Sequence, residues 1–157
     1  VRKNKTGIRA KRPQDLAVRC SRCCKPVPGD ESVGFVTRGR GVSIHRTDCI
    51  NVINLPEDER GRLIDAEWQV AENPTSTEQY STEIQIFANN RIGLFADISK
   101  VFTEKQIDIT SMNVRTSKQG RATIIMTFDI HGTEELNRIT DKIRQIDGVL
   151  DIQRTTG

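Results

Sequence analysis

The 157-residue sequence contains few aromatic and few large apolar side chains. Aromatic residues make up 4% and hydrophobic residues 35% of the chain, whereas 29% of the residues are charged. No apolar run approaches the ~18 residues that a membrane-spanning helix needs, which excludes such a helix and gives no reason to expect a membrane partner. A single domain of this length normally has a richer core, so the composition favours two small domains.

The sequence also lacks the marks of a secreted protein and of an enzyme. No apolar stretch follows the N-terminus and the first residue is Val1 rather than Met, so we expect no secretory signal, a cytoplasmic location and a fragment of a longer protein. Histidine occurs only at positions 45 and 131, and there is no nucleophile elbow, His–Asp pair or cluster of carboxylates. We therefore expect no catalytic residues in this chain.

Positive charge is concentrated at the N-terminal end. Residues 1–46 contain 12 Lys and Arg against 3 Asp and Glu, whereas residues 73–157 contain 10 against 11. The basic segment is compatible with binding to a polyanion and equally with a solvated linker. Residues 71–79 are polar and contain Pro74, so we expect a linker there between two halves of different composition.

The half that follows the linker has a regular apolar pattern. Alternating residues predict strands over residues 80–88, 107–116, 122–130 and 149–152. Apolar residues at helical spacing predict one helix from Leu94 to Phe102 and another that Thr133 caps and whose buried face extends from Leu136 to Ile146. The order βαββαβ predicts a ferredoxin-like fold, in which both helices cover one face of a four-stranded antiparallel sheet.

The first half is less regular. Its apolar patterns predict short strands over residues 33–37 and 42–45 around a glycine-rich hairpin, a short helix over 48–54 and a strand over 63–68. This half has too few apolar residues to be stable through its core alone. We therefore expect a small α/β module that a metal ion or another cross-link stabilises, and an α+β class for the whole chain.

The first half contains all four cysteines and one histidine: Cys20, Cys23, Cys24, His45 and Cys49. His45 and Cys49 have a spacing that lets an imidazole and a thiolate bind one ion, and four such ligands would form a closed, structural zinc site. Spacing favours Cys20 and Cys23 as the other two ligands, because the side chains of the adjacent Cys23 and Cys24 tend to diverge. Small buried thiols without metal are the alternative, and the lack of a secretory signal disfavours disulfides.

Two segments of the first half resemble a known family. Residues 23–30, CCKPVPGD, and 37–49, TRGRGVSIHRTDC, are similar to the C-terminal regulatory region of long RelA/SpoT-type (p)ppGpp synthetase/hydrolases. The βαββαβ unit, with NRIGL at residues 90–94 in its first turn, resembles the ACT domain that ends those proteins. The resemblance implies a zinc-finger-like domain (18–70) and an ACT domain (80–157), and charge and composition add a basic N-terminal connection (1–17) and the linker (71–79).

The resemblance implies a ligand set that differs from the one favoured by spacing. In the family, the vicinal cysteines, the histidine and the last cysteine form the zinc-finger-like site. Carried over to this chain, the zinc ligands are Cys23, Cys24, His45 and Cys49. Cys20 is then an additional cysteine and not a ligand.

A regulatory function is also implied by the resemblance. In the family, N-terminal domains make and degrade (p)ppGpp, and the C-terminal modules contact the ribosome when uncharged tRNA occupies the A site. This chain would then couple amino-acid starvation to catalytic domains that it does not contain, and its parent would be a GTP pyrophosphokinase, a (p)ppGpp hydrolase or both. The candidate contacts to rRNA phosphates are Lys25, Arg38, Arg40 and Arg46, with solvated arginines as the alternative.

A function of another class follows from the ACT resemblance. ACT domains often bind amino acids at the first strand-to-helix turn, where a helix N-terminus can receive a carboxylate, at an interface between paired domains. The chain would then form a homodimer and sense a branched-chain amino acid through Asn90, Ile92, Gly93 and Leu94. The family commonly has Asp where this chain has Asn90, which puts recognition of the ammonium group in question. A purely structural turn is the alternative.

Overall fold

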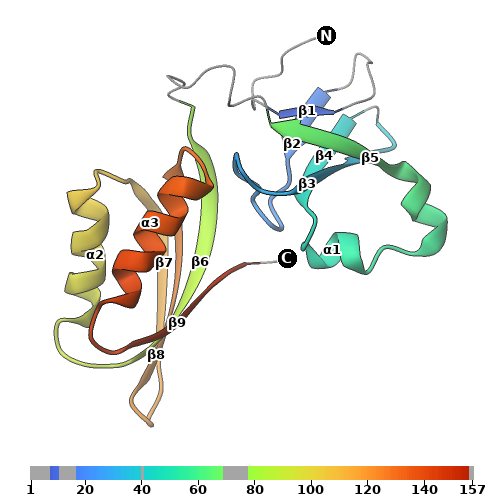
Figure 1. Ribbon diagram of the computed structural model, residues 1–157. Helices are drawn as coiled ribbons and strands as arrows, with labels where there is room; N and C mark the ends of the chain where they lie inside the picture. The colour runs from blue at the N-terminus through green and yellow to red at the C-terminus, as the bar shows by residue number, and fades with distance from the viewer. Residues whose placement is uncertain (1–7, 11–16, 40, 69–77, 156–157) are drawn as a thin grey trace. The chain divides into compact units, whose positions relative to one another are not determined.

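The computed structural model describes residues 8–10, 17–39, 41–68 and 78–155. The chain forms two compact units, and the division falls between Tyr80 and Ser81 (Figure 1). Each unit has its own β-sheet together with helical segments, which confirms the expected α+β class. Most of the expected N-terminal connection and of the expected linker lies outside the described residues.

The first unit is built on a five-stranded sheet in the order β1-β5-β3-β4-β2. Its strands are β1 (Ile8–Ala10), β2 (Ala17–Cys20), β3 (Ser32–Val36), β4 (Gly41–Arg46) and β5 (Leu63–Trp68). β2 runs parallel to β4, and the other neighbouring strands are antiparallel. Between β4 and β5 lie the helix α1 (Ile50–Ile53) and the 3-10 helix η1 (Glu57–Arg62).

Apolar patterns in the sequence predict part of this unit. The strands β3, β4 and β5 and the helix α1 lie where the sequence predicts them. β1 and β2 are not predicted, because strands of three and four residues carry too little alternation to be recognised. Their place in the sheet depends on pairing with β5 and β4, which lie far away in the sequence.

The apolar core of the first unit is small. Val42, Ile44 and Ile64 form it, and partly buried neighbours pack against them. Gly34 allows this packing, because a Cβ there would lie 2.8 Å from Val42 Cγ1 and 3.0 Å from Ile64 Cγ1. A separate buried cluster consists of Cys24, Cys49 and Val52. Two of its three members are thiols, so their chemistry bears directly on the stability of this unit.

The second unit has the fold that its alternation predicts. Its elements are β6 (Tyr80–Asn89), α2 (Leu94–Glu104), β7 (Ile109–Thr116), β8 (Arg121–Ile130), α3 (Thr133–Arg144) and β9 (Val149–Arg154). The sheet order is β7-β8-β6-β9, and α2 and α3 lie together on one face of the sheet (Figure 1). Alternate residues of β6 and β8 are buried. The expected ferredoxin-like βαββαβ arrangement is confirmed.

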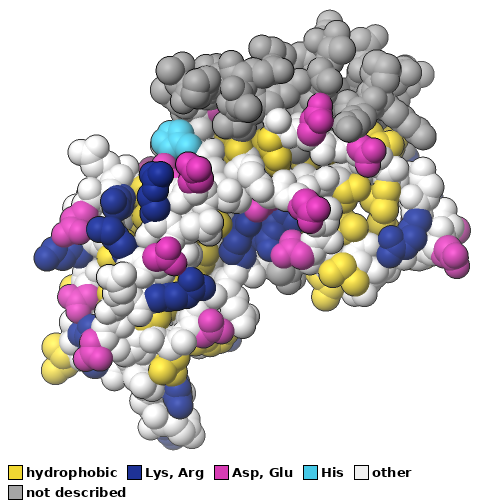
Figure 2. Space-filling model, viewed as in Figure 1, with side chains coloured by type: hydrophobic (Ala, Val, Ile, Leu, Met, Phe, Trp, Pro, Cys, Tyr) yellow, Lys and Arg dark blue, Asp and Glu magenta, His cyan; other side chains and the backbone are white. Residues whose placement is uncertain are grey.

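The core and the surface of the second unit are clearly separated. Phe102 of α2 and Phe128 of β8 pack edge to face in the core, with ring centroids 4.9 Å apart. On the face seen in Figure 2, acidic and basic side chains are interspersed over this unit. In the part of the chain that is described, no helix is both long and apolar enough to cross a membrane.

Candidate metal centre

A tight turn over residues 21–25, the cysteine turn, follows β2 and carries the vicinal cysteines. The Ser21 amide donates a hydrogen bond to the Ile44 carbonyl (2.8 Å), which attaches the turn to β4, and the Lys25 amide donates to the Ser21 carbonyl (3.3 Å). The backbone curls here, so Cys23 and Cys24 direct their sulfur atoms to the same region. Adjacent side chains of an extended chain would diverge instead.

Four donor atoms converge beside this turn. Cys23 Sγ lies 3.3 Å from His45 Nδ1 and 3.5 Å from Cys49 Sγ. His45 Nδ1 lies 3.9 Å from Cys24 Sγ and 3.6 Å from Cys49 Sγ. All four donor atoms lie within 4.8 Å of one another. A tetrahedral zinc ion with Zn–S of ~2.3 Å and Zn–N of ~2.0 Å would separate its ligands by roughly 3.5–3.8 Å, so the cluster has the size of a zinc site.

The converging residues are those implied by the family resemblance. The group consists of Cys23, Cys24, His45 and Cys49, and Cys20, at the end of β2, is not part of it. The spacing argument preferred Cys20 because it assumed that neighbouring side chains diverge. This assumption does not hold here, because the turn after β2 brings both vicinal sulfurs within 3.9 Å of His45 Nδ1.

Burial and hydrogen bonds shift the pKa values of three of the donor groups. Burial raises the pKa of the Cys49 thiol and lowers the pKa of His45, so the His45 ring is neutral near pH 7, the form that binds metal. For Cys23, burial raises the pKa, but hydrogen bonds with Ser21, Asn51 and the neighbouring thiols outweigh it and lower the pKa. Metal binding would displace the thiol protons, so affinity for a metal should rise with pH.

Cys20 is not one of the converging donors, so a bound metal would not protect it, but its thiol should still resist alkylation. Burial, followed by the charges of Cys24 and Asp30, raises the pKa of the Cys20 thiol from 9.0 to about 12. At pH 8 the thiolate fraction is then about 10⁻⁴, against about 0.1 for a thiol with a pKa near 9. We expect iodoacetamide to modify Cys20 about a thousandfold more slowly than a cysteine in a short peptide, as followed by mass spectrometry. A peptide-like rate at pH 8 would contradict this expectation.

Arg46, expected as an exposed contact to RNA, is buried. Only 5% of the residue is exposed. Its Nε and Nη2 donate to the Asp48 carboxylate (2.9 and 2.6 Å), and its Nη1 donates to the Cys24 carbonyl (3.2 Å). The guanidinium therefore binds groups of the cysteine turn and of the β4–α1 connection, and is not presented to solvent. Sequence alone places this arginine at the surface because buried arginines are rare.

The other candidate RNA contacts are Lys25, Arg38 and Arg40. Arg38 is exposed at the turn between β3 and β4, where the Thr37 amide donates to the Gly41 carbonyl (2.8 Å). Lys25 is partly buried at the end of the cysteine turn, with a positive φ of 47°. Arg40 lies outside the described residues. Arg38 is thus the candidate whose exposure the structure supports.

The turn after β6 carries the four effector-binding candidates: Asn90, Ile92, Gly93 and Leu94. The Ile92 side chain is fully exposed and Leu94 is fully buried, so these two side chains do not line one site. Gly93 has a φ of 85°, which lets α2 begin directly after the turn. The Arg91 guanidinium crosses the turn and donates to the Asp97 carboxylate (2.7 Å).

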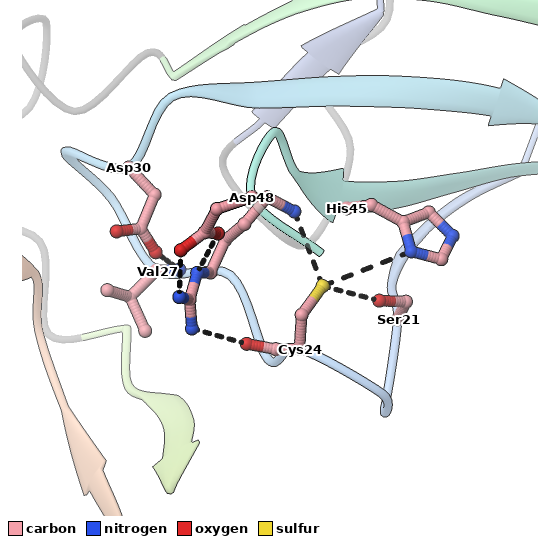
Figure 3. A network of polar contacts seen from close by, with 7 residues as sticks. Ser21, Cys24, Val27, Asp30, His45 and Asp48 are labelled. Carbon is pink, nitrogen blue, oxygen red and sulfur yellow. Dashed lines mark hydrogen bonds and ion pairs between the residues drawn. The ribbon is translucent and has the colours of Figure 1, made fainter. Parts of the chain in front are cut away.

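Sequence reasoning missed one polar residue of the candidate metal centre. Ser21 Oγ lies within 3.3 Å of Cys23 Sγ and 3.2 Å of Cys24 Sγ. Serine is common in turns, so its position before the vicinal cysteines carries no distinctive signal. Figure 3 shows Ser21 and His45 approaching the sulfur of Cys24.

Two protein families match this chain, each over a different part of it. The RelA/SpoT RIS domain family matches residues 8–69, and the ACT domain family matches residues 76–154. The GTP pyrophosphokinase of Streptomyces coelicolor is 37% identical over 150 residues, which are 96% of this chain and 17% of that protein. The bifunctional (p)ppGpp synthase/hydrolase RelA of Mycobacterium tuberculosis is 34% identical over 150 residues, which are 96% of this chain and 20% of that protein.

The chain is also similar to a solved structure. This structure is the crystal structure of the ACT domain from the GTP pyrophosphokinase of Chlorobium tepidum, with 22% sequence identity and a TM-score of 0.45. The match covers 49% of the present chain and 99% of the Chlorobium chain. The chain spans no more than a fifth of the two curated relatives described above. From the two family matches, the chain belongs to the RelA/SpoT family, of which it carries a RIS domain followed by an ACT domain.

Proposed function

We propose that this chain is a regulatory region that couples uncharged tRNA on the ribosome, the sign of amino-acid starvation, to catalytic domains that make or hydrolyse (p)ppGpp. The relatives named GTP pyrophosphokinase and bifunctional (p)ppGpp synthase/hydrolase support a parent protein of that class. The chain would bind ribosomal RNA in the cytoplasm, and other domains of the parent protein would contain the catalytic groups.

The convergence of four metal donors carries this proposal. Three thiols and one imidazole at tetrahedral separations suit a structural zinc ion with no open position for a substrate. Zinc would be held by Cys23, Cys24, His45 and Cys49, and would fix the cysteine turn, β4 and α1 to one another. A rigid domain of this kind suits docking better than chemistry.

One strand connects the metal centre to the exposed arginine. β4 carries His45 near one end, and its other end closes the hairpin on which Arg38 is exposed. A zinc ion bound to His45 would stiffen the base of this hairpin. Preorganisation reduces the entropy that is lost when a guanidinium binds a phosphate, so a stiff hairpin would bind RNA more tightly than a flexible one.

Charge reversal at Arg38 should weaken binding to ribosomes. We expect the Arg38→Glu chain to bind about tenfold more weakly at low salt, because a phosphate contact is replaced by repulsion. The slope of log affinity against log salt concentration should become shallower by about 1. Cosedimentation of the chain with purified ribosomes at several salt concentrations measures both quantities.

An arginine in the ACT domain provides the control. Arg138 lies on α3 with a side chain that is 71% exposed, so Arg138→Glu makes the same change of charge at another surface position. This variant should bind ribosomes as the unaltered chain does. If Arg38→Glu also binds with unaltered affinity and salt dependence, the docking proposal for this hairpin is wrong.

A further inference from the structure

The candidate metal centre has polar contacts that its four ligands do not explain. Besides the Ser21 hydroxyl, the backbone amide of Arg46 points to a sulfur, donating to Cys24 Sγ across 3.3 Å. Figure 3 shows Ser21 and His45 at the Cys24 sulfur, which this amide also reaches. Two hydrogen-bonding groups therefore reach the thiols from outside the ligand set.

The side chain of Arg46 acts on the same turn through the backbone. Its guanidinium is planar and has five N–H groups in fixed directions, so it can join two acceptors rigidly. Here it joins the Cys24 carbonyl to the Asp48 carboxylate. A charge buried this deeply is costly unless its hydrogen bonds are made, so these contacts hold the arginine and the cysteine turn together.

The charge of the site gives these hydrogen bonds a chemical role. Three thiolates and a neutral imidazole around a divalent cation leave one net negative charge, which resides largely on sulfur. Ser21 Oγ must be the donor once the metal is bound, because a thiolate has no proton to give. Hydrogen bonds to sulfur lower its electron density, which makes a metal-bound thiolate less reactive toward electrophiles and acids. Outer groups of this kind typically change metal affinity by about 10- to 100-fold.

We propose that Ser21 and Arg46 are positioning residues of the metal centre. The Ser21 hydroxyl and the Arg46 amide hold and shield the vicinal thiolates, and the Arg46 side chain fixes the backbone of Cys24. This inference rests on the proposed zinc site. It gives Arg46 a role in retaining the metal, in place of a contact to RNA.

Replacement of the Ser21 hydroxyl tests the proposal. The Ser21→Ala chain should release zinc to a chelator about tenfold faster, and its zinc-loaded thiols should react faster with iodoacetamide. The thiolate-to-metal absorption band of the cobalt-loaded chain should also shift, because the sulfurs lose a hydrogen bond. If Ser21 had only a structural role, its replacement by alanine would lower the Tm and leave the position of this band unchanged. Ser21→Thr restores a hydroxyl, so it should restore the unaltered behaviour.

Two further variants complete the experiment. Ser111→Ala removes an exposed hydroxyl from β7 and should change none of these measurements. Arg46→Lys keeps the positive charge but loses the planar pair of donors, so it should also release zinc about tenfold faster.

The outcomes separate this inference from the proposed function. If the unaltered chain binds zinc and cobalt but Ser21→Ala shows unaltered release, alkylation and absorption, the role of Ser21 is wrong and the metal centre stands. An unaltered rate of zinc release from Arg46→Lys overturns the role of the Arg46 side chain. If the folded, unaltered chain binds neither metal, the proposed metal centre fails and this inference fails with it.

Discussion

A chain with Cys24 replaced by serine should bind almost no zinc and should lose the folded structure of its RIS domain. Cys24 is only 2% exposed and belongs to the small buried cluster that contains Cys49. A serine hydroxyl does not ionise near neutral pH and is a much poorer zinc ligand than a thiolate. Structural zinc supplies about 10–16 kcal/mol in small domains, which is comparable to the whole stability of a typical domain.

Two measurements follow this loss directly. Elemental analysis should find about one zinc ion per unaltered chain and almost none in the Cys24→Ser chain. Trp68 is the only tryptophan of the sequence, and its indole N–H donates to the Asp30 carbonyl (3.1 Å) within the RIS domain. Its fluorescence should therefore shift to longer wavelength as this domain unfolds and the indole becomes hydrated.

Cys20→Ser is the matched control, because it removes a thiol near the site that is not one of the four converging donors. This chain should retain its zinc and its tryptophan spectrum. The reverse result, with zinc lost from Cys20→Ser and kept by Cys24→Ser, would restore the ligand pair that spacing favours. Absence of zinc from a well-folded, unaltered chain would show that the cysteines serve as core residues. The proposed docking to RNA would then lose the zinc-stabilised domain on which it is argued.

The largest effect on the ACT domain is expected from Phe128→Ala. Phe128 is fully buried in β8 and packs against the ring of Phe102. Removing the ring deletes a large apolar surface and leaves a cavity between the sheet and α2. We expect the free energy of unfolding to fall by about 3–5 kcal/mol. Urea denaturation followed by circular dichroism measures this change, and Trp68 fluorescence follows the RIS domain in the same samples.

Ile125→Ala provides a control in the same strand. Ile125 lies on the opposite face of β8, where its side chain is 36% exposed and α2 and α3 do not cover it. Its truncation removes apolar contacts without opening a cavity in the core, so it should lower the free energy of unfolding by about 1 kcal/mol. Equal losses for Ile125→Ala and Phe128→Ala would contradict the assignment of the two faces of the sheet.

The ACT domain was predictable because its pattern is local. In β8, the alternate residues from Ala122 to Ile130 are all apolar and all buried. The stripe that includes Leu94, Ile98 and Phe102 repeats at the helical period and is buried on α2. A strand or an amphipathic helix of this length reveals its type and its buried face within about ten residues, so no distant contact is needed to recognise it.

The RIS domain was less predictable because its contacts are distant in sequence. β2 has four residues, and it becomes a strand only by pairing in parallel with β4. Arg46 is buried because the carbonyl of Cys24, 22 residues earlier, lies beside it. A charged residue at the end of a short strand looks exposed until the partner that binds it is known.

By itself the sequence determined the two-part organisation, the βαββαβ order of the ACT domain, and the set of cysteines and histidine that supplies the candidate metal centre. Spacing and the family resemblance favoured different ligand sets, and only the tertiary structure showed that both vicinal sulfurs converge with His45 and Cys49. It also showed that Ser21 and Arg46 lie against these thiols, and that Ile92 is exposed while Leu94 is buried. Periodicity depends on neighbours along the chain. Convergence depends on how the turn after β2 is attached to β4, and this attachment is made by hydrogen bonds between segments more than twenty residues apart.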